Sequence, residues 1–111
     1  MRLAVAATPH VAIPTLNYLL ASQDSLVRIF TTEDKYAGRG RVITPSEVSS
    51  WADSHGVECI KVGKASDMSA YLDDIDCVVT VAFGLLLPQE ILTIPKYGFI
   101  NLHFSLLPAW R

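Results

Sequence analysis

Residues 77–103 read CVVTVAFGLLLPQEILTIPKYGFINLH, and this stretch decides the fold. It begins with a continuous apolar and β-branched run, Cys77–Ala82, which is typical of a strand buried on both faces. A loop over Phe83–Pro88 and a short helix near Gln89–Leu92 follow, and the chain then turns into a second apolar strand, Phe99–His103. A strand, a crossover helix and a second strand in this order predict two parallel strands joined by a right-handed connection.

Strand and helix patterns also alternate upstream of this unit. A nearly continuous apolar run predicts a strand over Leu3–Ala7, and strands are also expected over Leu26–Thr31 and Val57–Val62, the last of them short and nearer the sheet edge. The complete order, β-α-β-(loop)α-β-α-β-α-β, predicts a doubly wound, mostly parallel Rossmann-like α/β sheet. The chain has 111 residues, which allows one domain at most.

Local signals place the helices between these strands. Pro14 suits the first turn of a helix, and Ser46 is a candidate N-cap for a second helix that ends at Gly56. The residues expected to face the core from these two helices are Leu16, Leu19, Leu20, Val48, Trp51 and Ala52. A short helix is expected over Asp67–Leu72, with Ser66 as its cap, whereas residues 32–45 have no clear period and are expected to form a long loop.

Composition narrows the class of protein. Half of the residues are apolar and the net charge is -2, which indicates a soluble globular domain whose contacts with any RNA must be local. Cys59 and Cys77 lie in strand-like stretches without a Cys-x-x-Cys pair, so two buried reduced thiols are favoured over a disulfide or a metal site. Pro9 and Pro14 interrupt any signal peptide, and no apolar run approaches the ~20 residues of a membrane span. We therefore expect a cytoplasmic protein without a membrane, DNA or metal partner.

Polar residues gather where the predicted strands end. Ligands of open parallel sheets bind outside the carboxyl ends of the strands, so the candidates are Thr8-Pro9-His10, residues 32–45, Phe83–Pro88 and the end of Asn101–His103. Strand alternation places Asn101, His103 and Ser105 on one side and Ile100, Leu102 and Phe104 on the other.

An asparagine beside a histidine suits acyl transfer. Asn101 and His103 can both donate hydrogen bonds to an oxygen that gains charge, and an imidazole can also move a proton near neutral pH. The three-residue motif alone more often marks two side chains that satisfy backbone groups at a strand end. Ser105 lies in no Gly-x-Ser-x-Gly elbow, so a hydrolase is not indicated.

A basic, glycine-containing stretch lies within the expected long loop. Lys35 precedes Ala37-Gly38-Arg39-Gly40-Arg41, where glycines allow a close approach of the backbone and arginines offer phosphate contacts. Alone, such a loop is more often simply solvated. The Gly-x-Gly neither follows a strand directly nor opens a helix, so a dinucleotide site is not indicated.

Together these segments resemble the 10-formyltetrahydrofolate-dependent formyltransferase family. Asn-x-His followed by Ser-Leu-Leu-Pro is fairly specific to that family, and the Ala-Gly-Arg-Gly loop narrows the resemblance to its branch that acts on initiator methionyl-tRNA. The matching segments are Thr8-Pro9 with Val11-Ala12 and Pro14, residues 37–40, Pro45-Ser46, Phe83–Pro88, Asn101–His103 and Ser105–Pro108.

The resemblance implies a reaction, a formyl donor and a set of roles. The α-amino group of methionine on initiator tRNA attacks the formyl carbon of 10-formyltetrahydrofolate, for translation initiation, while Asn101 binds the formyl oxygen and His103 stabilises the oxyanion or shuttles the proton. The folate pocket would be shaped by Phe83, Gly84, Leu85, Leu86, Leu87, Pro88, Ser105, Leu106, Leu107 and Pro108. The acceptor end of the tRNA would meet the loop that carries Lys35, Gly38, Arg39, Gly40 and Arg41.

The resemblance also implies that residues 1–111 are the amino-terminal part of a catalytic domain with an incomplete sheet. The family uses an aspartate further along the chain that no residue here matches, and a carboxy-terminal tRNA-binding domain is absent. We therefore expect the 111 residues alone to be inactive, and to be marginally stable or prone to aggregation because a strand edge would remain unpaired. The alternatives are a formyltransferase for a phosphoribosyl amine or a nucleotide sugar, and a non-catalytic remnant that at most binds folate.

Overall fold

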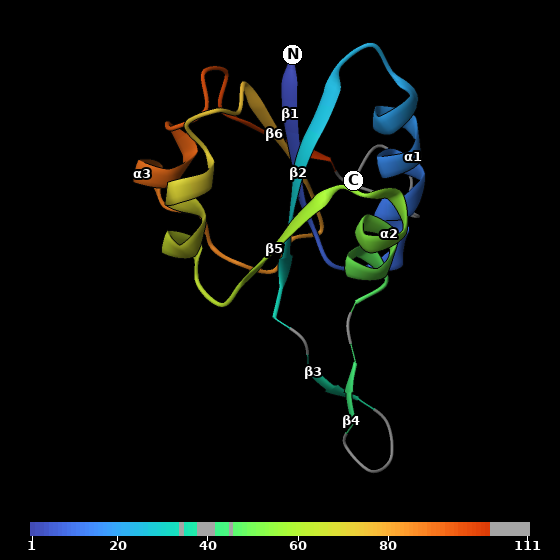
Figure 1. The fold of residues 1–111 in the computed structure, drawn as a ribbon. Coiled ribbons are helices and arrows are strands. Elements are labelled where there is room, and N and C mark those ends of the chain that lie inside the picture. Colours follow the sequence, from blue (N-terminus) through green and yellow to red (C-terminus); the bar gives the residue numbers. More distant parts are fainter. Residues whose placement is uncertain (34, 38–41, 45, 103–111) are drawn as a thin grey trace, which may run out of the picture.

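Five parallel strands form the sheet at the centre of the molecule (Figure 1). The computed structural model describes residues 1–33, 35–37, 42–44 and 46–102. The sheet has the order β5-β2-β1-β6-β7. Its strands are β1 (Arg2–Ala7), β2 (Ser25–Thr32), β5 (Glu58–Val62), β6 (Cys77–Val81) and β7 (Phe99–Leu102). The strand order runs outward from β1 in both directions, which confirms the predicted doubly wound α/β sheet with β5 at an edge.

Helices cover the two faces of this sheet, on opposite sides in Figure 1. The helices α1 (Ile13–Ala21), preceded by the 3₁₀ turn η1 (His10–Ala12), and α2 (Glu47–His55) pack on one face. The 3₁₀ helix η2 (Ala65–Tyr71) and the short helix α3 (Gln89–Leu92) pack on the other. Alternate residues of β1 divide between the two cores, as a doubly buried strand requires.

The start and end of α2 follow the signals in the sequence. The Ser46 hydroxyl accepts a hydrogen bond from the Ser49 backbone N–H at 3.0 Å, and Gly56 ends the helix with a left-handed φ of 67°. Val48, Trp51 and Ala52 are buried between α2 and the sheet. These features confirm the predicted N-cap, C-terminal glycine and apolar face, each of which depends only on local chemistry.

The prediction of one long loop over residues 32–45 is wrong for the part that the structure describes. Lys35–Ala37 forms the strand β3 and Val42–Thr44 forms β4, and the two pair antiparallel as a small ribbon separate from the main sheet (Figure 1). Each strand has three residues, which is too short for an alternating pattern to be recognised. The three β-branched residues of β4 were the feature of the sequence that could have indicated a strand here.

Two smaller predictions about helices are also wrong. Ser66 does not cap η2, since this helix already begins at Ala65. The Asp67 carboxylate, within the helix, accepts hydrogen bonds from the backbone N–H groups of Gly63 at 2.9 Å and Lys64 at 3.1 Å. Leu20 does not face the core either. It is 42% exposed, whereas Leu16 on the same helix is fully buried.

Candidate functional site

A cavity of about 310 Å³ opens where β6 and β7 end. The loop that follows β6 forms one wall and β7 forms another, so two segments predicted as candidate sites meet there. The described lining residues are Thr80, Phe83, Leu85, Leu86, Leu87, Leu92, Phe99 and Asn101. None of these eight side chains is titratable, so this lining offers apolar contacts and hydrogen bonds but no charge.

Asn101 provides the carboxamide of this cavity. It lies directly opposite Thr80 in the parallel pairing of β6 with β7, and the Thr80 hydroxyl donates a hydrogen bond to Asn101 Oδ1 at 2.9 Å. Thr80 is 6% exposed, while Asn101 is exposed. The carboxamide therefore stands at the rim of the cavity with its oxygen held from the neighbouring strand.

Strand alternation separates the two faces of β7 as predicted, within the residues that the structure describes. Phe99 and Asn101 line the cavity, whereas Ile100 and Leu102 line an apolar groove on the opposite face, against Tyr18 and Leu19 of α1. Ile100 is 53% exposed and Leu102 is 37% exposed. Successive side chains of β7 therefore point to opposite faces of the sheet.

The loop after β6 presents apolar side chains to the cavity. Phe83, Leu85 and Leu87 are half-buried against the core, and Leu86 is 94% exposed. Ala82, at the junction of β6 and the loop, has a left-handed φ of 50°, a conformation that costs a non-glycine residue about 1–2 kcal/mol. The tight turn at Ala82 redirects the chain from the buried strand to the cavity rim.

Several of the predicted site residues lie elsewhere. Gly84 and Pro88 belong to the predicted loop but do not line the cavity, and Pro88 instead precedes α3. Lys35 begins β3, in the two-stranded ribbon. The predicted residues outside the described part of the chain are His103, Ser105, Leu106, Leu107, Pro108, Gly38, Arg39, Gly40 and Arg41.

Thr80, Leu92 and Phe99 line the cavity but were not among the predicted site residues. Thr80 carried a signal in the sequence, because it is the polar residue in an otherwise apolar strand. Phe99 and Leu92 carried none, since apolar residues at those positions are equally expected in the core.

The turn after β1 was another predicted candidate. The Thr8 hydroxyl lies 3.2 Å from the Thr32 hydroxyl, and His10 is exposed in η1. Thr8 therefore joins the ends of β1 and β2, and this segment does not contribute to the lining of the cavity beside β7.

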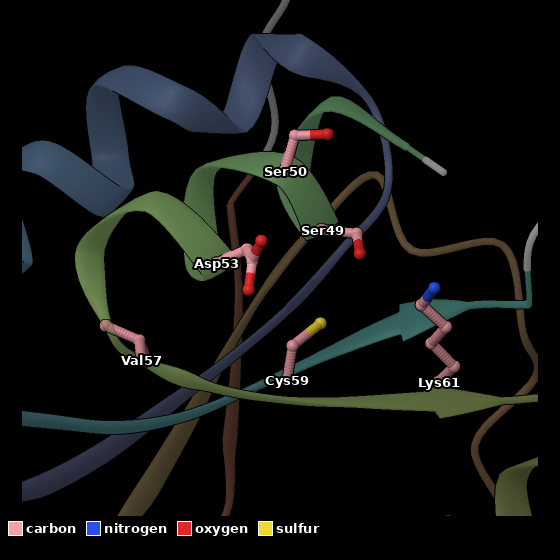
Figure 2. A pocket seen from close by; sticks show the side chains of 6 residues that line it. All are labelled: Ser49, Ser50, Asp53, Val57, Cys59 and Lys61. Carbon is pink, nitrogen blue, oxygen red and sulfur yellow. The ribbon is translucent and has the colours of Figure 1, made fainter. Parts of the chain in front are cut away.

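A second cavity, of about 440 Å³, lies between α2 and β5 (Figure 2). Figure 2 shows the side chains of Cys59 and Lys61 pointing from β5 toward α2, which carries Ser49, Ser50 and Asp53. Ser49, Ser50 and Val57 complete the described lining. β5 and β7 are the opposite edges of the sheet, so the second cavity is separate from the one that contains Asn101.

Two possible kinds of site find no support among the described residues. Within residues 1–33, 35–37, 42–44 and 46–102, no three His, Cys, Asp or Glu side chains are grouped so that they could hold a metal ion. A search of the same residues finds no helix with the length and apolarity that a membrane crossing needs.

The fold is an α/β sheet with a cavity beside an asparagine at the carboxyl ends of its parallel strands, which is where proteins of this class bind ligands. Comparison with known proteins gives the family. The family model for formyl transferases matches residues 1–111, and the chain belongs to this family.

Curated relatives of the chain are methionyl-tRNA formyltransferases. The protein from Thermobifida fusca is 50% identical and that from Salinispora tropica 47% identical, each over 100% of this chain and 37% of the relative. The protein from Rhodococcus erythropolis is 48% identical over 100% of this chain and 38% of the relative. The chain thus spans less than two fifths of the length of these relatives, and the family resemblance in the sequence is confirmed.

Proposed function

We propose that residues 1–111 form the amino-terminal part of a formyl transferase catalytic domain. The reaction is transfer of the formyl group from 10-formyltetrahydrofolate to the α-amino group of methionine on initiator tRNA, in the cytoplasm. The observation that carries the proposal is the position of Asn101 at the rim of a mostly apolar cavity, beside the loop after β6. The names of the curated relatives support methionyl-tRNA as the acceptor.

Asn101 acts on the formyl oxygen in this proposal. When the amine attacks the formyl carbon, a tetrahedral intermediate forms and the former carbonyl oxygen gains negative charge. A carboxamide N–H fixed before the reaction stabilises that charge without having to reorganise. His103, two residues further on, stabilises the same oxygen or transfers the proton that the amine loses.

The two substrates occupy different parts of the molecule. The apolar walls at Phe83, Leu85 and Leu87 suit the flat ring system of a folate, since such pockets combine apolar surface with a few polar groups. The tRNA acceptor end meets the segment of residues 32–45 through Lys35, Arg39 and Arg41. The remaining tRNA contacts belong to a carboxy-terminal domain outside residues 1–111.

We also propose that residues 1–111 do not complete the reaction alone. The described lining of the cavity holds no carboxylate that could orient His103. A purified 111-residue chain should therefore give no formyl-methionyl-tRNA, and measurable transfer by this chain would contradict that part of the proposal.

A chimera tests the reaction itself. Residues 1–111 replace the matching part of the Thermobifida fusca relative, and formylation of methionyl-tRNA is followed with 10-formyltetrahydrofolate as the donor.

Asn101→Ala should lower kcat by about 10²–10³, the usual loss when one oxyanion donor is removed. The matched control is Asn17→Ala, which removes the acceptor of the Trp51 indole N–H at 2.9 Å and should leave kcat near that of the parent chimera. A folded chimera without activity, or an Asn101→Ala variant as fast as its parent, would overturn the proposal.

A further inference from the structure

One hydrogen bond at the cavity joins a buried strand to the proposed catalytic carboxamide. Thr80 Oγ1 donates to Asn101 Oδ1 at 2.9 Å, and the two residues are direct partners across β6 and β7. Both side chains line the same cavity. The bond therefore lies within the site and is not a remote packing contact.

The direction of this bond determines what Asn101 can offer. A carboxamide has one oxygen, which accepts, and one nitrogen, which donates, on opposite branches of a planar group. The Thr80 hydroxyl donates to the oxygen, so the oxygen is held toward β6. Nδ2, the donor, then points away from Thr80. A rotation of 180° about the Cβ–Cγ bond would exchange the two atoms and leave the oxygen Oδ1 where the donor should be.

We propose that Thr80 is a positioning residue, which fixes the carboxamide of Asn101 so that its N–H group, and not its oxygen, meets the formyl oxygen. This inference rests on the proposed function of Asn101. In this role Thr80 acts on the reaction through Asn101.

The composition of β6 supports this role. The strand reads CVVTV, and a valine would fill almost the same volume as Thr80 at a position that is 6% exposed. A buried hydroxyl loses its hydration and is retained only where a hydrogen bond compensates for that loss. Thr31, the other buried threonine among the residues whose burial the structure describes, has its hydroxyl 3.2 Å from that of Ser46, the N-cap of α2, and so has a structural partner. Thr80 has Asn101.

The first experiment observes the carboxamide directly in the 111-residue chain. The side-chain NH₂ group of Asn101 gives a pair of signals in a proton–nitrogen correlation spectrum. Thr80→Val should shift this pair away from its position in the parent chain, whereas Thr80→Ser should keep it in place. Thr31→Val, which removes a buried threonine hydroxyl elsewhere, is the matched control and should also keep it in place.

The second experiment uses the active chimera with the Thermobifida fusca relative. Thr80→Val should lower kcat by roughly three- to tenfold, the value of one hydrogen bond, with the KM for 10-formyltetrahydrofolate unchanged. Thr80→Ser should restore kcat. In a chimera that already carries Asn101→Ala, adding Thr80→Val should lower kcat no further, because Thr80 acts only through Asn101.

The inference and the proposed function fail in different ways. An inactive chimera would contradict the proposed reaction. The NH₂ signals of Asn101 would still show whether Thr80 holds the carboxamide in place. The positioning role would be overturned if Thr80→Val left those signals unmoved, if Thr80→Ser lost as much kcat as Thr80→Val, or if the losses from Thr80→Val and Asn101→Ala were additive.

Discussion

Arg28 joins four parts of the chain through a single guanidinium group. Its side chain is 12% exposed, and it donates to Glu58 of β5 at 2.6 Å, to Asp74 at 2.8 Å and to the backbone carbonyl of Tyr71 at 2.8 Å. Asp74 also accepts from Arg2 of β1 at 3.1 Å. The cluster ties the edge strand β5 and the segment before β6 to the middle of the sheet.

The stability that Asp74 contributes should depend on pH, and Asp74→Asn should remove this contribution. The hydrogen bond from Arg28 holds the pKa of Asp74 below its usual value of 3.8, so the folded state favours the carboxylate. The contribution is complete above the unfolded pKa and is lost as the pH falls through the folded pKa, because the unfolded chain binds the proton more readily. At neutral pH the variant should be less stable by about 0.5–1 kcal/mol, since the pair is partly exposed.

Urea unfolding at several pH values measures this effect. The difference in unfolding free energy between the parent chain and Asp74→Asn should be present at neutral pH and should narrow once the pH falls below roughly 4. Asp73→Asn removes a negative charge at the neighbouring position and is the matched control. A difference that stays constant down to the lowest pH would show that the carboxylate charge of Asp74 does not stabilise the fold.

Strand alternation within the sequence placed Asn101 on the polar side of its strand, and the family resemblance gave it a predicted role in the site. The sequence did not predict Thr80, because the partner of a residue across two strands depends on their register. The pairing of Thr80 with Asn101 follows from tertiary structure, which joins residues 21 positions apart. Local patterns contain no such information.

Among the helices, α2 has the best defined boundaries, and its N-cap is testable. Ser46→Ala removes the acceptor for the Ser49 N–H and the partner of the Thr31 hydroxyl. The expected loss in unfolding free energy is about 1 kcal/mol, with Ser46→Asp recovering most of it because aspartate also caps helices well. Ser54→Ala, within the same helix and exposed, is the control and should change stability by less than half as much as Ser46→Ala. Denaturant titrations followed by circular dichroism give these values, and equal losses for Ser46→Ala and Ser54→Ala would contradict the capping role.

The elements that the sequence predicted well share a physical property. The sheet strands β1 and β6 carry continuous apolar runs and α2 carries cap residues, and both signals act within a few residues of the chain. β3 and β4 were missed because each has three residues, which is too short for a recognisable pattern, although β4 is β-branched throughout. The start of η2 was missed for a related reason, since Asp67 caps the turn from inside the helix and Ser66 does not cap it.

At the scale of the whole molecule, the two faces of the sheet are covered unequally. α1 and α2 cover β1, β2 and β5 on one face, but on that face the described residues beside β7 form an open apolar groove of about 450 Å³. The opposite face of β7 carries the cavity with Asn101. The strand that provides the proposed catalytic group is therefore also an edge strand of the described sheet, with apolar side chains exposed behind it.

An exposed apolar groove beside an edge strand predicts self-association of the 111-residue chain. Ile100 and Leu102 present apolar surface next to unpaired backbone groups of β7, and both features favour contacts between copies. Light scattering coupled to size exclusion should show a mass that rises with protein concentration, and Ile100→Thr should reduce that rise while preserving strand propensity. Tyr97→Thr removes a side chain that is 61% exposed outside the groove, and it should leave the association unchanged. A parent chain that stays monomeric at all concentrations, or an equal effect of both substitutions, would show that this groove is not the contact between copies.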